Sequence, residues 1–156
     1  MSYSPRGFVF LQDSQYTTTN RLSVNNARVQ LTKDGLGANT STLYAPQGMD
    51  SLWVNNELVP PYQGFYFNAR IDFQCEPGGV SDYMEVQADI GTPGSPINIL
   101  SRTQSFTKTG VNAVSIGVPI FCLATFVANN GKLYFDTSGS GDNIEIWGIS
   151  LYIGVG

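Results

Sequence analysis

The segment Phe121–Asp136 reads FCLATFVANNGKLYFD, and its Asn130-Gly131 pair stands between two apolar runs. Asn-Gly is the strongest short-range signal of a β-hairpin, because a two-residue type I′ turn needs positive φ at both central residues. The pair therefore predicts a hairpin whose register follows by counting from the turn, with Phe126 opposite Phe135. One face of this hairpin is apolar throughout and is the expected core face; its residues are Cys122, Ala124, Phe126, Ala128, Leu133 and Phe135.

The opposite face of the hairpin predicts contacts with a second subunit. Residues 120–127 are apolar on both faces, whereas an antiparallel strand with one face in water alternates apolar and polar residues. A helix is the competing interpretation of this run, but its β-branched and aromatic residues and the preceding Pro119 favour a strand. The final run, residues 143–153, has the same character. Because one sandwich offers only one core, we expect an oligomer interface formed by Phe121, Leu123, Val127, Tyr134, Trp147 and Tyr152.

The rest of the chain has the pattern of short strands joined by turns. Phe65–Cys75 alternates apolar and polar residues, residues 84–90 repeat the alternation, and the more polar residues 97–107 are typical of a sheet edge. Trp147-Gly148 interrupts the alternation of the last strand and predicts a β-bulge. About eight closely spaced strands without helical periodicity predict an all-β fold, an antiparallel jelly-roll β-sandwich over residues 28–156.

Residues 1–27 are predicted to form an N-terminal arm. After the short apolar run at residues 7–11 the segment is polar, so it has too little apolar surface to become ordered alone. We expect it to lie along the domain as an edge strand or to reach a partner. Its apolar residues Phe8, Phe10 and Leu11 are the expected attachment points, because an extended segment can add to a neighbouring sheet edge.

Composition narrows the classes of partner. Charged residues are only 13% of the chain, the formal net charge is −4 and there is no basic run, so neither nucleic acid nor an anionic membrane is an expected partner. Residues 1–5 lack the features of a secretory signal, and no apolar run reaches transmembrane length, so we expect assembly in a cytoplasm. Cys75 and Cys122 fall on apolar faces and are expected to be buried thiols rather than a disulfide or a metal pair.

The sequence argues against catalysis. It contains no histidine, which removes Ser-His-Asp and Cys-His nucleophile systems and most zinc sites. Acidic residues 72–89 alternate with core residues, so a solvated strand face explains them better than a pair of glycosidase carboxyls. Residues 136–143 lack the terminal Glu of a calcium loop and fit a polar turn better. We therefore expect no enzyme activity, no metal and no cofactor.

The closing stretch Glu145–Ile153, EIWGISLYI, resembles the last strand of tumour-necrosis-factor-like trimeric jelly-roll proteins. Small tailed-phage capsid decoration, cement and head-fibre proteins use similar domains, and this chain is similar to them in size and in its Asn/Thr/Gly-rich surface. The resemblance implies a homotrimer with the last strand near the three-fold axis. It also implies a non-enzymatic structural protein of the virion, a decoration, cement or fibre component that binds the major capsid protein or another virion protein of a bacteriophage.

A carbohydrate-binding jelly-roll module is the alternative function. Such modules stack sugar rings on exposed aromatic side chains, and Trp53, Tyr62, Tyr66 and Tyr83 are candidates for a platform that binds a surface glycan. Scattered surface or core aromatics are the simpler interpretation of the same residues. A virion fibre could combine both functions.

Overall fold

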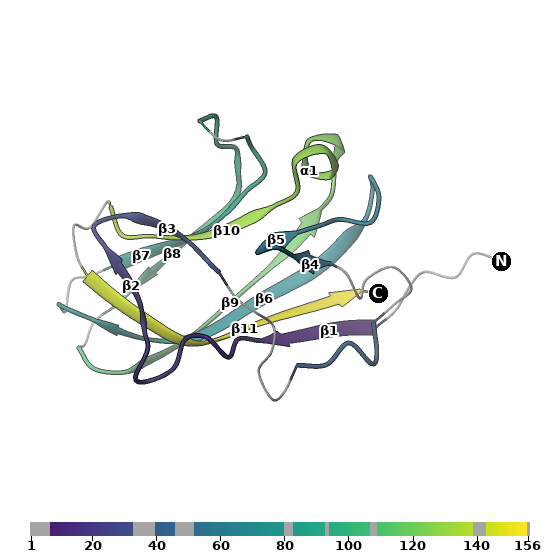
Figure 1. Ribbon diagram of the computed structural model, residues 1–156. Coiled ribbons are helices and arrows are strands. Elements are labelled where there is room, and N and C mark those ends of the chain that lie inside the picture. Colours follow the sequence, from purple (N-terminus) through teal and green to yellow (C-terminus); the bar gives the residue numbers. More distant parts are fainter. Residues whose placement is uncertain are drawn as a thin grey trace.

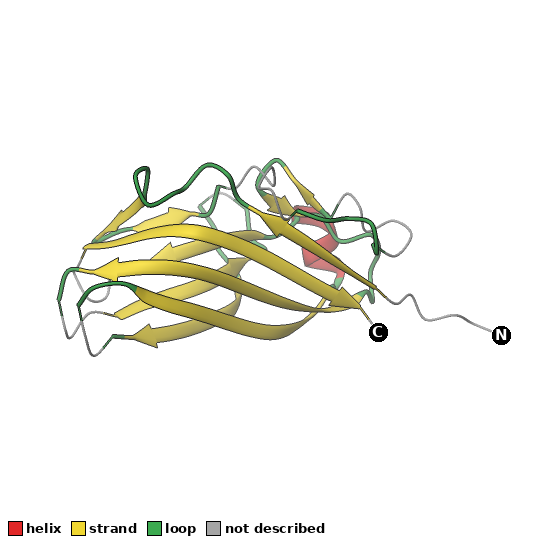
Figure 2. Ribbon diagram, turned by 90° about the horizontal axis from the view of Figure 1, so that it is seen from below, coloured by secondary structure: helices red, strands yellow, loops and turns green. Residues whose placement is uncertain are grey.

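The computed structural model describes residues 7–32, 40–45, 52–79, 83–92, 94–106, 109–138 and 143–155. Two antiparallel sheets pack face to face in it and form a jelly-roll sandwich, which confirms the predicted fold class (Figure 1). The five-stranded sheet has the order β1-β11-β6-β9, with β2 also paired to β11. Its strands are β1 (Gly7–Gln12), β2 (Leu22–Asn25), β6 (Tyr66–Pro77), β9 (Asn112–Phe121) and β11 (Asn143–Val155). Figure 2 shows the long strands of this sheet from below.

The four-stranded sheet has the order β3-β10-β7-β8. Its strands are β3 (Arg28–Gln30), β7 (Tyr83–Asp89), β8 (Asn98–Ser105) and β10 (Lys132–Asp136). β8 lies at the edge of this sheet, as its polar sequence predicts, and most of its side chains are exposed.

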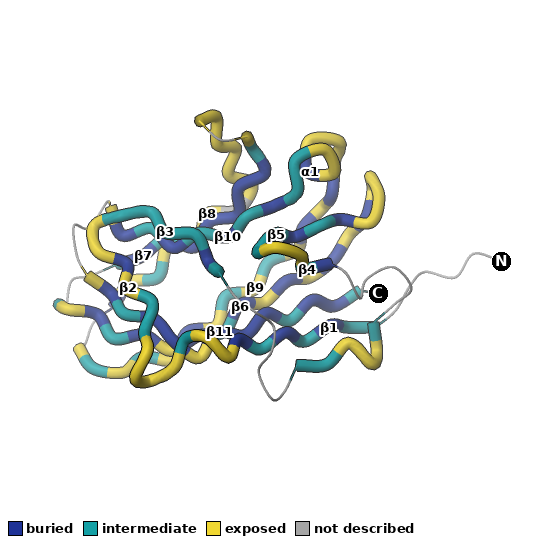
Figure 3. The backbone as a smooth tube through the Cα atoms, in the orientation of Figure 1, coloured by how far each residue is buried: buried dark blue, intermediate teal, exposed yellow. Residues whose placement is uncertain are grey.

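The core lies between the two sheets and follows the period-2 pattern of the strands. Along β6 buried residues alternate with exposed or half-buried ones, which Figure 3 shows as alternating colours. The rings of Phe73 and Phe135 meet edge to face at 5.2 Å and so link the two sheets. Phe126, Leu133 and Phe135 are buried, as expected of core residues, but Phe135 stands opposite Val29 and Val86 rather than Phe126.

β11 is the central strand of the five-stranded sheet and contains the predicted bulge. Its register against β6 shifts between Trp147 and Ser150, and Gly148 takes φ +62° there, a conformation that favours glycine. The shift restores the alternation after the bulge, so the apolar residues on both sides of it face the core. The core residues of β11 are Ile144, Ile146, Ile149, Leu151 and Ile153.

The hairpin predicted at Asn130-Gly131 is wrong. Residues Ala124–Asn129 form a short helix, α1, which connects β9 in one sheet to β10 in the other. Asn130 ends the helix: its N–H donates to Phe126 O, and its φ is +60°. Phe126 is the buried residue of α1, and Cys122, which precedes the helix, is buried as well. Ala124 and Ala128, expected in the core, are exposed.

A two-residue turn with positive φ occurs elsewhere, at Asn55-Asn56. Their φ values of +53° and +63° fit a type I′ turn, and the turn joins β4 (Trp53–Val54) to β5 (Glu57–Leu58). β5 then reaches α1, because Leu58 and Gly131 exchange both main-chain hydrogen bonds, at 2.7 and 2.9 Å. Gly131 has no room for a side chain here, since a Cβ would lie 2.9 Å from Cζ of Phe126.

The described part of the predicted arm belongs to the sandwich, as the edge-strand alternative proposed. β1 pairs with β11 from Gly7↔Val155 to Gln12↔Ser150, and β2 pairs with the first half of β11. Val9 and Val24 are core residues. Residues 1–6 lie outside the described part of the chain.

Candidate functional site

Aromatic side chains gather on the outer face of the five-stranded sheet, toward the end where α1 lies. Phe8 stacks on Tyr44 with ring centroids 5.2 Å apart and on Tyr152 at 5.8 Å. One row further along, Tyr66 of β6 packs against Phe121 of β9 at 4.8 Å. We call the set of Phe8, Tyr44, Tyr66, Phe121 and Tyr152 the aromatic face.

The Tyr152 ring covers the middle of the aromatic face. Gly154 stands opposite Phe8 on one side and Asn68 on the other, and Asn68 stands opposite Pro119. The Tyr152 side chain lies over Gly154, where a Cβ would be 2.9 Å from the tyrosine oxygen. Gly154 therefore leaves room for the Tyr152 ring to lie flat on the sheet.

The apolar surface continues from the aromatic face to α1. Phe121 is 66% exposed and Leu123 is 64% exposed, and Val127 follows on the helix at 37%. Cys122 between them is buried and bonded on both sides, to Phe65 and Gly64. Contiguous exposed apolar side chains are typical of interaction sites, whereas single ones are ordinary.

At the other end of the same outer face, an arginine and two glutamates cover a tryptophan ring. Arg21 lies over the Trp147 ring at 4.1 Å and donates hydrogen bonds to Glu76 at 2.5 Å and Glu145 at 3.0 Å. These two carboxylates raise the pKa of Arg21. Trp147 is only 4% exposed, so it stabilises the subunit and has almost no surface left for a partner, contrary to the predicted interface role.

The outer face of the four-stranded sheet is polar. Tyr134, which the sequence placed in the oligomer interface, lies here on β10, with the Arg28 guanidinium 3.6 Å from its ring centroid. Arg28 reaches across β10 from β3 and donates to Gln87 at 2.8 Å and to Asp89 at 3.1 Å. Tyr134 is therefore on the opposite side of the sandwich from Tyr152 and Phe121.

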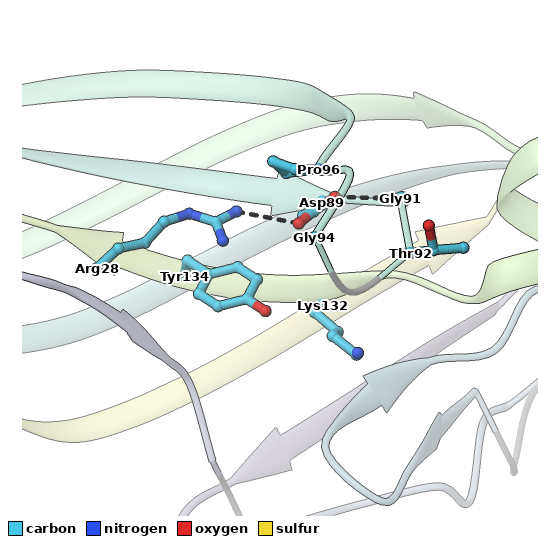
Figure 4. Close-up of a pocket in the computed structure, with 8 residues that line it drawn as sticks. All are labelled: Arg28, Asp89, Gly91, Thr92, Gly94, Pro96, Lys132 and Tyr134. Atoms are coloured by element: carbon cyan, nitrogen blue, oxygen red, sulfur yellow. Dashed lines mark hydrogen bonds and ion pairs between the residues drawn. The ribbon is translucent and has the colours of Figure 1, made fainter.

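A pocket of about 280 Å³ opens at one end of this polar face (Figure 4). Its lining comes from β3, the end of β7, the turn that follows β7, and β10. The lining residues are Arg28, Asp89, Gly91, Thr92, Gly94, Pro96, Lys132 and Tyr134. These residues come from three separate segments of the chain, residue 28, residues 89–96 and residues 132–134, and form no motif, so the sequence carried no signal for the pocket.

Asp89 holds the frame of the pocket together. Its Oδ1 accepts the main-chain N–H groups of Gly91 and Ile97, both at 2.8 Å, which closes the turn after β7. Its Oδ2 accepts from Arg28. Burial alone would raise the pKa of Asp89, but the two backbone hydrogen bonds and Arg28 outweigh it and lower the pKa below its ordinary value.

The predicted attachment residues lie in β1. Leu11 is buried in the core and unavailable to a partner in this conformation, whereas Phe8 and Phe10 are half-buried. The free edge of β1 is covered, because Phe10 and Ser41 exchange main-chain hydrogen bonds and Phe8 N donates to Tyr44 O. Main-chain addition of β1 to another sheet is therefore blocked here.

The aromatic residues considered for sugar stacking come from different strands and loops of the fold. Tyr83 is in β7 of the four-stranded sheet and Tyr66 is in β6 of the five-stranded sheet. Trp53 is half-buried in β4, and Tyr62 contacts Phe65 edge to face at 5.4 Å.

Within the described ranges, the remaining titratable groups form no cluster of three or more metal-ligand side chains. Part of the loop considered for calcium, residues 139–142, lies outside those ranges. Cys75 and Cys122 are buried free thiols, and burial raises the pKa of each to about 11. No helix in the described part of the chain is long and apolar enough to cross a membrane.

The sequence matches no family model and no curated protein. Among solved structures, the chain is similar to the globular domain of zebrafish complement 1qA protein, with a TM-score of 0.50 and 9% identity over 95% of this chain and 94% of that one. It is also similar to Eiger TNF of S. frugiperda, with a TM-score of 0.49 and 9% identity over 97% of this chain and 92% of that one. A third similar structure is the PRD1 vertex protein P5, with a TM-score of 0.48 and 13% identity over 99% of each chain. At such identities the likeness concerns the fold alone, a jelly-roll sandwich.

Proposed function

We propose that this protein is a non-enzymatic structural protein of a virion. It assembles as a homotrimer through the outer face of the five-stranded sheet and attaches to a phage capsid as a decoration, cement or fibre component. The observation that supports the proposal best is the aromatic face, which continues over Leu123 and Val127 at the end of the sandwich.

The two outer faces of the sandwich differ in a way that suits such an assembly. The aromatic face presents large rings beside Gly117 and Pro119, so apolar area is concentrated there. The charged residues beside it, Arg70 and Asp72, pair with each other at 2.9 Å, so subunits can meet there without burying an unpaired charge from this pair. A closed ring of three copies buries the face without leaving an open end.

The first test is the mass of the purified chain and of a charged variant. We expect a particle of three times the 16.9 kDa chain mass by light scattering at micromolar concentration. Phe121→Asp should give a folded monomer, because residue 121 is exposed in the subunit but would place an unpaired carboxylate in the interface. Ser105→Asp, an equal charge change on exposed β8 of the other sheet, is the matched control and should remain a trimer. A wild-type monomer, or a Phe121→Asp trimer, would refute the interface.

The second test concerns attachment to the capsid. In this proposal the side chain of Phe10, rather than the covered main chain of β1, contacts the capsid protein, because Phe8 already belongs to the aromatic face. Phe10→Ser should keep the trimer mass but no longer co-sediment with capsids that lack the protein. Retention of Phe10→Ser on such capsids at the wild-type level would exclude this contact.

A further inference from the structure

The polar pocket on the four-stranded sheet lies on the side of the sandwich opposite the aromatic face. All of its lining residues come from one subunit, and an assembly through the aromatic face leaves it open to solvent. Its walls are fixed before any ligand arrives, because Asp89 ties the turn after β7 to Arg28, and Arg28 is stacked on Tyr134. Such preorganisation lowers the entropic cost of binding.

Hydrogen-bond donors dominate what the pocket offers to a ligand. The oxygens of Asp89 already accept three hydrogen bonds, from Gly91, Ile97 and Arg28. Arg28 uses Nε and Nη2 for protein partners, and its Nη1 has none among the residues that the structure describes. The Lys132 ammonium lies 3.7 Å from Glu57, too far for a direct hydrogen bond. Two cationic groups therefore remain able to donate to an anion.

The remaining surface suits a sugar ring. The hydroxyls of Thr92 and Tyr134 can exchange hydrogen bonds with sugar hydroxyls, and the Pro96 ring and the Lys132 stem offer apolar contact to its C–H groups (Figure 4). The volume of about 280 Å³ lies just below the range of about 300–1,000 Å³ that is usual for drug-sized ligands, which fits a single ring.

We infer that this pocket binds an acidic monosaccharide unit, with its carboxylate between Arg28 and Lys132 and its hydroxyls toward Thr92 and Tyr134. The inference gives the alternative glycan-binding function a specific place and ligand class, on residues other than the aromatic side chains expected from the sequence. It does not depend on the virion role or on the trimer.

The test is a titration of the isotope-labelled protein followed by amide chemical shifts. Methyl β-D-glucuronide should shift the signals of Gly91, Thr92 and Gly94 in a saturable way. Methyl β-D-glucoside, which has a hydroxymethyl group in place of the carboxylate, should bind at least about ten-fold more weakly, because it loses the charge-assisted hydrogen bonds. Acetate should also bind at least about ten-fold more weakly, since it lacks the ring.

Lys132→Gln and Arg102→Gln make a matched pair of variants. Both remove one positive charge from the four-stranded sheet, but Arg102 is exposed on β8 and does not line the pocket. Lys132→Gln should weaken glucuronide binding about ten-fold, with an unchanged melting temperature, whereas Arg102→Gln should bind as the wild type does. Arg28→Lys should also weaken binding, because an ammonium cannot reproduce the guanidinium geometry.

Several outcomes would overturn the inference. They are no saturable shift at tens of millimolar glucuronide, equal binding of the glucoside or of acetate, and equal binding by Lys132→Gln. Light scattering on the same samples reports the assembly state, so a failed trimer and a failed sugar site give different results.

Discussion

Phe126→Ala tests how α1 holds one end of the sandwich. Phe126 is 1% exposed, and its ring packs on Gly131, which in turn is bonded to β5. A helix of six residues has little stability of its own, so this ring is the main anchor of α1. Truncating a fully buried Phe to Ala costs about 3–5 kcal/mol, and we expect a value near the upper end, because the neighbouring β5 and Gly131 lose their packing partner as well. For a chain of this size the melting temperature should fall by about 6–20 °C.

The measurement is urea unfolding followed by circular dichroism at a fixed protein concentration, with Thr125→Ala as the control. Thr125 is the preceding residue on the same helix but is exposed, so its truncation should cost only about 0.5 kcal/mol. A loss below about 1.5 kcal/mol for Phe126→Ala, or equal losses for both variants, would refute the anchoring role of this ring.

Four further predictions concern separate parts of the chain. Ala128→Glu should leave the unfolding free energy within about 0.5 kcal/mol of the wild type, because residue 128 is exposed on α1; a severe loss would support the hairpin instead. Gly131→Ala should cost about 1–3 kcal/mol in urea unfolding, since its Cβ would meet the Phe126 ring at 2.9 Å; a neutral result would mean that the ring moves freely. The pKa of Asp89 is lower in the folded protein than its ordinary value of 3.8, so the ionised carboxylate stabilises the fold above that pH, and this stabilisation is lost as the pH falls through the folded pKa. The stability advantage of the wild type over Asp89→Asn should therefore shrink between about pH 5 and pH 2. A difference that stays constant over this range would contradict the prediction. Cys75 and Cys122 should react with a thiol reagent at pH 8 only after unfolding, because each is buried with a pKa of about 11; labelling at the rate of free cysteine would show an open core.

The alternation of apolar and polar residues predicted the strands of the sandwich well. β6, β7 and β11 have the expected inward rows, and the bulge at Trp147-Gly148 lies where the alternation breaks. These strands could be predicted because a two-layer sandwich gives each of them one face to bury, so period 2 in the sequence becomes period 2 in burial.

The segment before Asn130-Gly131 could not be predicted in this way, because two local signals competed. Asn-Gly with flanking apolar runs indicates a hairpin, but Asn130 instead takes its positive φ at the end of α1, and the tight two-residue turn uses Asn55-Asn56. The β-branched and aromatic residues of this run favoured a strand, so the short helix left no clear signal in the sequence. Tertiary packing decided between the two, since β9 and β10 belong to different sheets.

The candidate surfaces were predicted only in part. Phe121 and Tyr152 lie on the aromatic face, with Leu123 and Val127 beyond its edge, although the hairpin that suggested them does not form. Tyr134 was misplaced because the predicted hairpin put β10 in the wrong sheet, and Trp147 was misplaced because the sequence does not reveal that Arg21 covers its ring. The polar pocket combines residues from distant segments, and only the folded chain brings them together.

The central place of β11 sets the order in which the chain can fold on the ribosome. β1 and β2 find their strand partner only in β11, whose residues are synthesised after those of every other described strand. Until then the nascent chain exposes apolar strands with unpaired edges, which favours aggregation and chaperone binding. Closure of the five-stranded sheet must therefore wait for the synthesis of β11, and the long sequence separation between β1 and β11 makes it slow. In the proposed trimer, subunits can associate only after this last strand has entered the sheet, because it carries Tyr152 of the aromatic face.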